Sequence, residues 1–133
     1  MSGGLSADAV CAAALTMLRP LSAERQALFA RAGPPETVWA CLLDGRFERV
    51  PPVGYLVGRS SNRAQLLTSA RSIDLDAVRQ QLTAAGVGVV WWGGPGYPRA
   101  LDADPERPAV LFTRGSLDVL DERPCVAVVG TRT

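Results

Sequence analysis

The chain has 133 residues, 47% of them hydrophobic, and a formal net charge of +1. This length and apolar content predict one globular domain or two small ones and exclude a disordered segment. The near-neutral charge excludes attraction of nucleic acid or an anionic membrane by bulk charge, so a polyanion site has to be a local cluster.

The amino-terminal half has the pattern of a helical domain. Residues 5–18 predict an alanine-rich helix that Pro20 ends. Residues 22–32, with a serine as N-cap, and residues 35–43 predict two further helices. The Pro- and Gly-rich residues 46–60 predict a loop.

Two more helices complete this half. One covers residues 61–72, and Asp74 caps the other, which Gly86 ends. The apolar residues of this last helix repeat at helical spacing on one face. We divide the chain here into a helical domain, residues 1–74, of the SAM or helix-hairpin kind, and an α/β domain, residues 75–133.

Strand patterns occupy the carboxyl-terminal half. Residues 87–92 form a short β-branched and aromatic run between glycines, which predicts a strand followed by a turn at residues 93–96. Residues 97–101 predict an elbow that leads into a short helix or an extended segment. Residues 110–113 and 125–129 predict two further strands, the last an apolar run typical of a buried parallel strand. We expect residues 126–129 either to pair at a sheet edge or to be poorly ordered with exposed apolar surface.

Several chemistries are excluded by missing residue types. The chain contains no histidine and no lysine, so arginine is its only strongly basic residue. This excludes a histidine base, a catalytic triad, a P-loop lysine, a Schiff-base lysine and a histidine metal site. Cys11, Cys41 and Cys125 lack metal or redox spacing, so we interpret them as small buried hydrophobic residues. Without a signal peptide or membrane span, the expected location is the cytoplasm.

The strongest candidate site follows the last predicted strand. Gly130 allows main-chain N–H groups to form an anion-binding concavity, Thr131 offers a hydroxyl, and Arg132 can hold a phosphate with two parallel hydrogen bonds. The alternative is that Gly130 is an ordinary turn and Arg132 is solvated. Neither the dinucleotide fingerprint nor a Walker motif is present, so we predict no nucleotide cofactor.

Two other features extend this candidate site. Arg114 also follows a strand and precedes a glycine, so parallel packing would place its guanidinium at the same sheet edge as Arg132. The alternative is an ion pair between Arg114 and Asp118. Trp91 and Trp92 could stack bases, but adjacent strand residues face opposite ways, so at most one can do so, and we favour core packing.

Three motifs in order carry a family resemblance. They are Gly-Tyr-Pro-Arg-Ala-Leu at residues 96–101, Pro-Ala-Val-Leu-Phe-Thr-Arg-Gly at residues 108–115, and Val-Ala-Val-Val-Gly-Thr-Arg at residues 126–132. This set resembles the DNA-processing protein A family, also called DprA or Smf. The resemblance covers residues 75–133, while the helical half is similar only in position and general character.

The resemblance implies a bacterial cytoplasmic protein of natural transformation that binds and protects incoming single-stranded DNA and assists loading of the RecA recombinase. It implies no enzyme activity and no cofactor, and it places Arg132 in the DNA pocket. The implied fold class is α/β: a helical domain followed by the first strands of a truncated Rossmann-like parallel sheet. We expect the chain to be an amino-terminal portion that lacks the surfaces for homodimerisation and for RecA.

Two other functions stay open from the residues. The helical half could be a protein-interaction module without DNA affinity. Alternatively, the chain could be an enzyme acting on nucleoside phosphates, such as a phosphoribohydrolase, although the acidic and glycine-rich segments expected of one are absent.

Overall fold

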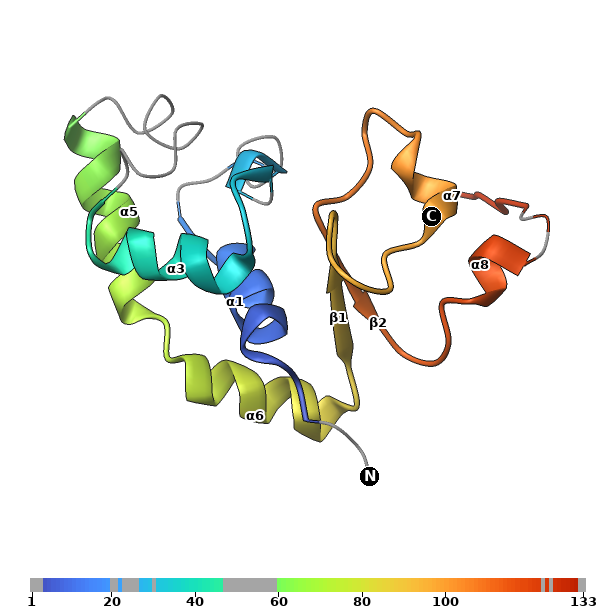
Figure 1. Ribbon diagram of the computed structural model, residues 1–133, viewed down its shortest axis with the longest axis horizontal. Helices are drawn as coiled ribbons and strands as arrows, with labels where there is room; N and C mark the ends of the chain where they lie inside the picture. The colour runs from blue at the N-terminus through green and yellow to red at the C-terminus, as the bar shows by residue number, and fades with distance from the viewer. Residues whose placement is uncertain are drawn as a thin grey trace.

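A helical group and a small sheet make up the computed structural model, and they lie side by side (Figure 1). The structure describes residues 4–19, 22, 27–29, 31–46, 60–122, 124 and 126–131. In this part of the chain, no helix is long and apolar enough to cross a membrane.

Helix α1 (Ala7–Leu15) lies at the centre of the molecule and is buried along most of its length. It is shorter than the helix predicted over residues 5–18. The Ser6 hydroxyl caps its start by accepting a hydrogen bond from the N–H of Ala9 at 3.1 Å, and Thr16 is its C-cap. Its small alanine side chains allow close packing on two sides. One side contacts α3, and the other contacts α6 and strand β1.

The helical group surrounds a first hydrophobic core. Helix α3 (Pro35–Leu43) has the predicted bounds, and α5 (Ser60–Ser72) begins one residue before its prediction. The buried residues of this core are Cys11, Ala14, Leu15, Leu18, Phe29, Val38, Trp39, Leu42, Leu66 and Ala70. Of the predicted helix over residues 22–32, residues 27–29 and 31 are helical. The predicted loop lies mostly outside the described residues, because these omit 47–59.

Helix α6 (Leu75–Ala85) has both predicted caps. The Asp74 carboxylate accepts hydrogen bonds from the N–H groups of Asp76, at 2.9 Å, and Ala77, at 3.4 Å. Gly86 ends the helix in the left-handed conformation with φ of 66°. Val78 is the buried residue of this helix and joins a second hydrophobic core.

The sheet corrects the predicted fold class, because its two strands are antiparallel and not parallel. Strands β1 (Gly88–Trp91) and β2 (Val110–Thr113) pair with Gly88 opposite Thr113 and Trp91 opposite Val110. The chain that connects the strands leaves the Trp91 end of β1 and returns to the same end, where Val110 begins β2. Trp92 N–H donates to the Ala109 carbonyl at 2.9 Å and thereby continues the pairing beyond the strands.

Glycine turns and one tyrosine explain this chain reversal. Gly93 has a φ of 86° and Gly96 a φ of 81°, which favour glycine and turn the chain back. The Tyr97 hydroxyl then donates a hydrogen bond of 2.6 Å to the Pro108 carbonyl. A parallel pair would instead need a crossover along the sheet, and the short helix α7 (Arg99–Asp102) does not provide one.

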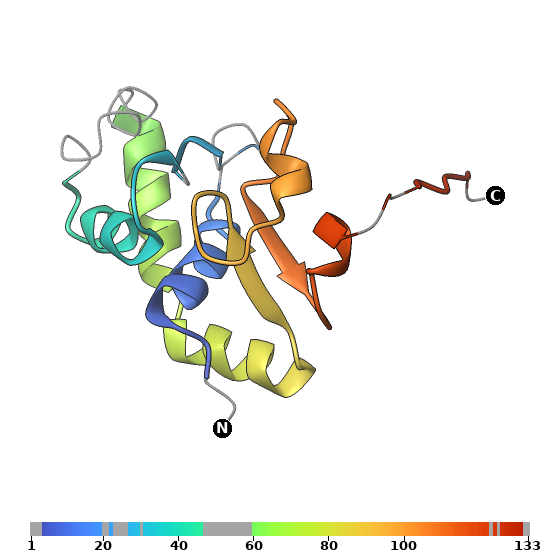
Figure 2. The same cartoon turned by 45° about the vertical axis from the view of Figure 1, so that its right-hand side comes forward.

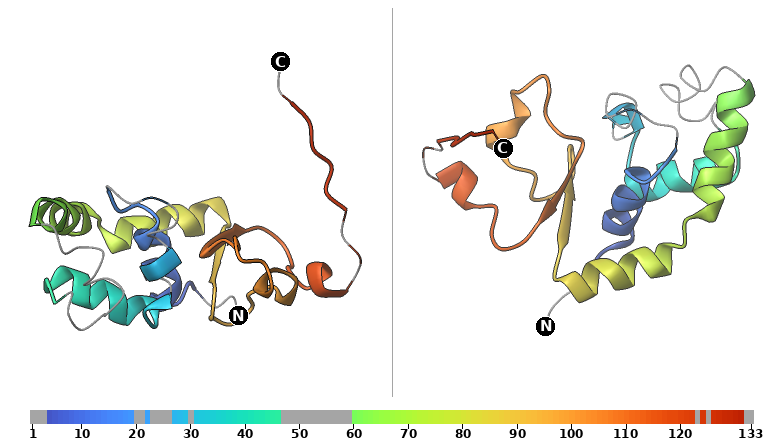
Figure 3. Two further views of the ribbon diagram at one scale, coloured as in Figure 1. Left: turned by 90° about the horizontal axis from the view of Figure 1, so that it is seen from above. Right: turned by 180° about the vertical axis from the view of Figure 1, so that it is seen from behind.

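The predicted third strand is not formed by the residues that the structure describes, and the alternative expectation of exposed apolar side chains is confirmed. Residues 126–130 have no regular secondary structure, and Cys125 lies outside the described residues. Val126, Val128 and Val129 are 86%, 95% and 90% exposed. Figures 2 and 3 show this segment leaving the body of the molecule. A strand needs a hydrogen-bonded neighbour, and no described residue of this tail reaches the sheet.

An unpredicted helix, α8 (Val119–Glu122), precedes the tail and contacts α7. The Asp121 carboxylate accepts hydrogen bonds from the N–H groups of Arg99, at 3.2 Å, and Ala100, at 2.9 Å. One short helix therefore caps the other. The tail leaves from the side of the molecule where these two helices lie (Figure 2).

The second hydrophobic core crosses the predicted domain boundary. It joins residues of α1 to residues of α6 and β1, namely Ala9, Val10, Ala12, Ala13, Val78, Val89 and Trp91. The helical region and the sheet thus share buried surface. The division into residues 1–74 and 75–133 stays a prediction.

Candidate functional site

The predicted phosphate-binding residues lie mainly in the exposed tail. Gly130 and Thr131 are described and have no regular structure, while Arg132 lies outside the described residues. Gly130 is not among the described glycines with positive φ, and open space surrounds it. The expected turn at Gly130 includes Arg132, which lies outside the described residues, so the turn and the proposed role of these residues stay predictions.

Arg114 lies elsewhere, exposed and directly after β2. The antiparallel register places this end of β2 beside Gly88, at the start of β1. The argument for a shared sheet edge with Arg132 required parallel strands, so it no longer holds. Within the part of the chain that the structure describes, Arg114 also forms no ion pair with Asp118.

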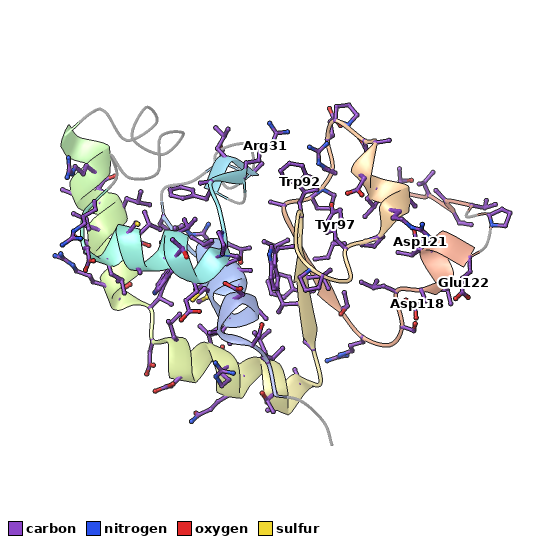
Figure 4. All side chains as sticks on the ribbon, viewed as in Figure 1. Arg31, Trp92, Tyr97, Asp118, Asp121 and Glu122 are labelled. Atoms are coloured by element: carbon purple, nitrogen blue, oxygen red, sulfur yellow. The ribbon has the colours of Figure 1, made fainter. Side chains whose placement is uncertain are left out.

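A different group of cationic and aromatic side chains meets between the helices and the sheet. We call Arg31, Trp92 and Arg107 the arginine–tryptophan cluster. The guanidinium carbon of Arg107 lies 4.2 Å from the centre of the Trp92 ring, and that of Arg31 lies 5.3 Å from it. Both distances are within the range of cation–π attraction. Figure 4 shows Arg31 on the helical side and Trp92 on the sheet side.

Strand alternation explains why only one tryptophan joins this cluster. Trp91 is buried in the second core, whereas Trp92, one residue on, is half-buried. The two indoles differ in burial, as strand alternation predicts, although both line the cavity described below. Trp91 therefore packs in the second core, while Trp92 contacts the guanidinium groups of Arg31 and Arg107.

Main-chain carbonyls hold Arg107 in place. Its guanidinium donates to the carbonyl of Asp104 at 3.0 Å and to that of Asp102 at 3.3 Å. These bonds orient the planar group while it lies near the indole. Arg107 thus stiffens the side chain of Trp92, and both charges remain uncompensated by an ion pair in the described ranges.

A cavity of about 390 Å³ adjoins the cluster. Its lining consists of Asp8, Arg31, Gly33, Pro34, Pro35, Trp91, Trp92, Gly93, Gly94 and Pro95. Asp8 is the acidic residue among them, and its carboxylate accepts a hydrogen bond of 2.9 Å from the Glu36 N–H in the first turn of α3. The walls are otherwise rings and glycine backbone, with the guanidinium of Arg31 as the positive group.

Two groups with raised pKa values are structural. Burial raises the pKa of the Tyr97 hydroxyl, which is committed to the Pro108 carbonyl. Burial, with smaller contributions from Glu36 and Asp8, raises the pKa of the Cys11 thiol to about 11. The interpretation of Cys11 as a buried hydrophobic residue is confirmed, Cys41 is half-buried, and Cys125 lies outside the described residues. Neither raised pKa provides an acid or base at neutral pH.

Arginine is the only strongly basic residue type at these sites, because the chain has no lysine and no histidine. No group of residues able to hold a metal ion occurs among those that the structure describes. Residues 88–133 match the family model of the DNA recombination-mediator protein A, which confirms the predicted DprA resemblance over that range. The match includes all three sequence motifs and connects the chain with DNA processing and recombination. The family description names a mediator and no catalytic activity.

The other comparisons add nothing to this assignment. No curated protein and no solved structure matches the chain significantly. The helical region lies outside the matched residues, which begin at Gly88.

The sequence prediction missed Arg31 and Arg107. Neither follows a strand or lies in a glycine turn, so no local pattern distinguishes them from solvated arginines. Trp92 was the one sequence feature that could have pointed to these two arginines. An indole on the face opposite a buried tryptophan needs another partner, and arginine is its common partner in proteins.

Proposed function

We propose that this protein binds single-stranded DNA in the bacterial cytoplasm during natural transformation, protects the incoming strand and assists RecA loading. The observation that carries this proposal is the family match over residues 88–133, which extends through the Gly-Thr-Arg segment. The protein acts by binding and catalyses no reaction. The homodimer that the family resemblance implies belongs to the same proposal.

The chemistry of the tail is compatible with this function. Gly130 has open space around it, so a sugar-phosphate strand can approach the main-chain amides closely. Thr131 and Arg132 add a hydroxyl and a bidentate cation. Arg114, exposed after β2 and not at a shared sheet edge with Arg132, supplies a second cation at a separate place on the surface. Such groups hold phosphates without reading bases, so binding is expected to be independent of sequence.

Fluorescence anisotropy with a labelled oligothymidylate tests this proposal across a salt series. Each phosphate neutralised on a single strand contributes a log–log salt slope of about 0.7, so two arginines give a slope of about 1.4. Arg132→Ala should abolish most of the binding. Arg46→Ala makes the same charge change at an exposed position of the helical region and should have no effect.

Equal losses in the two variants, or none in either, would remove Arg132 from the site. If the wild-type protein does not bind the oligonucleotide at low salt, the proposal of DNA binding is overturned and the protein-interaction module is favoured. The RecA part is tested separately. The lag before RecA filaments form on the same oligonucleotide should shorten when the protein is added, and an unchanged lag contradicts RecA loading.

A further inference from the structure

We propose that the arginine–tryptophan cluster and its cavity form a second site, which binds one nucleotide of a single-stranded nucleic acid. The base lies among the rings of the cavity, and Arg31 holds the adjoining phosphate. This inference rests on the proposed function and adds a specific place for a base, which the exposed tail does not offer.

The first argument is the state of the two cations. Nη1 of Arg107 donates to the carbonyls of Asp102 and Asp104, so Arg107 acts as a fixed partner for the indole. Arg31 is exposed, and its recorded contact within the described residues is the ring of Trp92. Toward the part of the chain that the structure describes, the guanidinium edge of Arg31 therefore remains open to an anion. Arginine suits phosphate because its planar fork donates two parallel hydrogen bonds.

The second argument is the shape and lining of the cavity. A volume of about 390 Å³ is within the range of small-molecule sites. The proline rings of residues 34, 35 and 95 and the two indoles offer flat apolar surfaces. Gly33 and Gly93 have nothing within 4 Å of the place of a Cβ atom, so a ligand can approach their backbone. A planar ring with an attached anion fits these walls.

The third argument is selectivity for single strands. Stacking between a base and an aromatic ring requires an exposed base face, which a duplex does not present. The lining residues of the cavity come from the helical region and from the end of β1 with the turn after it, so its occupant would contact both parts. The Asp8 carboxylate in the cavity wall already accepts a hydrogen bond from the Glu36 N–H. Because its negative charge repels a phosphate, the phosphate is expected at Arg31, outside the cavity.

The experiment compares Arg31→Gln with Arg46→Gln, which makes the same charge change at an exposed arginine outside the cluster. Full-length chains are titrated with labelled oligothymidylate and, separately, with unlabelled thymidine monophosphate while tryptophan emission is recorded. Arg31→Gln should weaken oligonucleotide binding by roughly five- to tenfold at low salt and lower the salt slope by about 0.7. Arg46→Gln should behave as wild type.

Nucleotide binding near Trp92 should quench the emission of the wild-type protein, and this quench should be lost in Arg31→Gln. Arg31→Lys keeps the charge without the planar fork and should bind with intermediate affinity. Thermal unfolding of each variant identifies a merely structural role. A lowered melting temperature with unchanged affinity would show that the cluster only joins the two halves, and would overturn the proposal.

The two proposals fail in different ways. Loss of binding in Arg132→Ala with normal binding and quenching in Arg31→Gln overturns the cavity site and leaves the proposed function standing. Failure of the wild type to bind any oligonucleotide overturns the proposed function. In that case a quench by thymidine monophosphate that depends on Arg31 still supports the cavity site, and absence of the quench overturns it.

Discussion

Gly94→Ala tests whether the turn after β1 and the buried indole pack as the structure describes. A Cβ atom at residue 94 would lie 2.8 Å from Cδ2 of Trp91 and still closer to Cε2 and Nε1 of the same ring. Real Cβ atoms do not approach other atoms this closely, so the turn or the indole has to move. Trp91 is only 9% exposed and packs in the second core, which resists such movement.

The magnitude follows from two opposing effects. Overpacking of a filled site costs about 1–3 kcal/mol. Replacing glycine by alanine where φ is not positive recovers about 0.4–1 kcal/mol by restricting the unfolded chain. The net expectation is a loss of about 1–2 kcal/mol in the free energy of unfolding, which lowers the urea midpoint by roughly 0.5–1 M.

Urea unfolding followed by tryptophan emission measures this loss. Gly4→Ala is the matched control, because nothing lies within 4 Å of its Cβ position and its φ is not positive. The double variant Gly94→Ala with Trp91→Leu tests the cause, since removing the ring should relieve most of the cost of alanine. A Gly94→Ala midpoint equal to that of Gly4→Ala, or a cost that persists in the leucine background, would refute the reasoning.

Three further predictions concern caps and a buried thiol. Asp74→Ala removes the N-cap of α6 and should cost about 1 kcal/mol in urea unfolding, whereas Asp76→Ala, which leaves that cap in place, should cost less. Asp121→Ala removes the acceptor for two N–H groups of α7 and should speed hydrogen exchange at Ala100, while exchange in α6 stays unchanged. The Cys11 thiol has its pKa raised from 9.0 to about 11, so the unfolded chain loses this proton first as pH rises. Stability should therefore fall between pH 9 and 11, by about 2–3 kcal/mol from this group, and Cys11→Ala should flatten that part of the curve.

The helices were predictable because their signals are local. Asp74 lies within two or three residues of the N–H groups that it caps, and Gly86 ends the same helix by its own backbone conformation. The bounds of α3 and β2 agree with the sequence pattern for the same reason. Helix α8 was missed because its four residues show no periodicity. The hydrogen bond from the Arg99 N–H of α7 to the Asp121 carboxylate of α8 joins residues that no local pattern connects.

The errors concern how the strands meet and which residues come together. The apolar run before Gly130 has the composition of a buried strand, but its described valines are exposed without a neighbouring strand. The expected shared edge for Arg114 depended on parallel pairing. Amino-acid composition indicates whether a segment can form a strand. The direction in which two strands pair depends on the path of the chain that connects them.

The sequence by itself determined the caps of α6, the places of β1 and β2, the restriction to arginine as the strong cation and the family resemblance of residues 88–133. Only the tertiary structure decided that the strands run antiparallel and that Arg31 reaches Trp92 beside a cavity. The physical reason is range. Caps and strand propensities act between residues a few positions apart, whereas the cluster joins two distant segments that packing of α1 against β1 brings together.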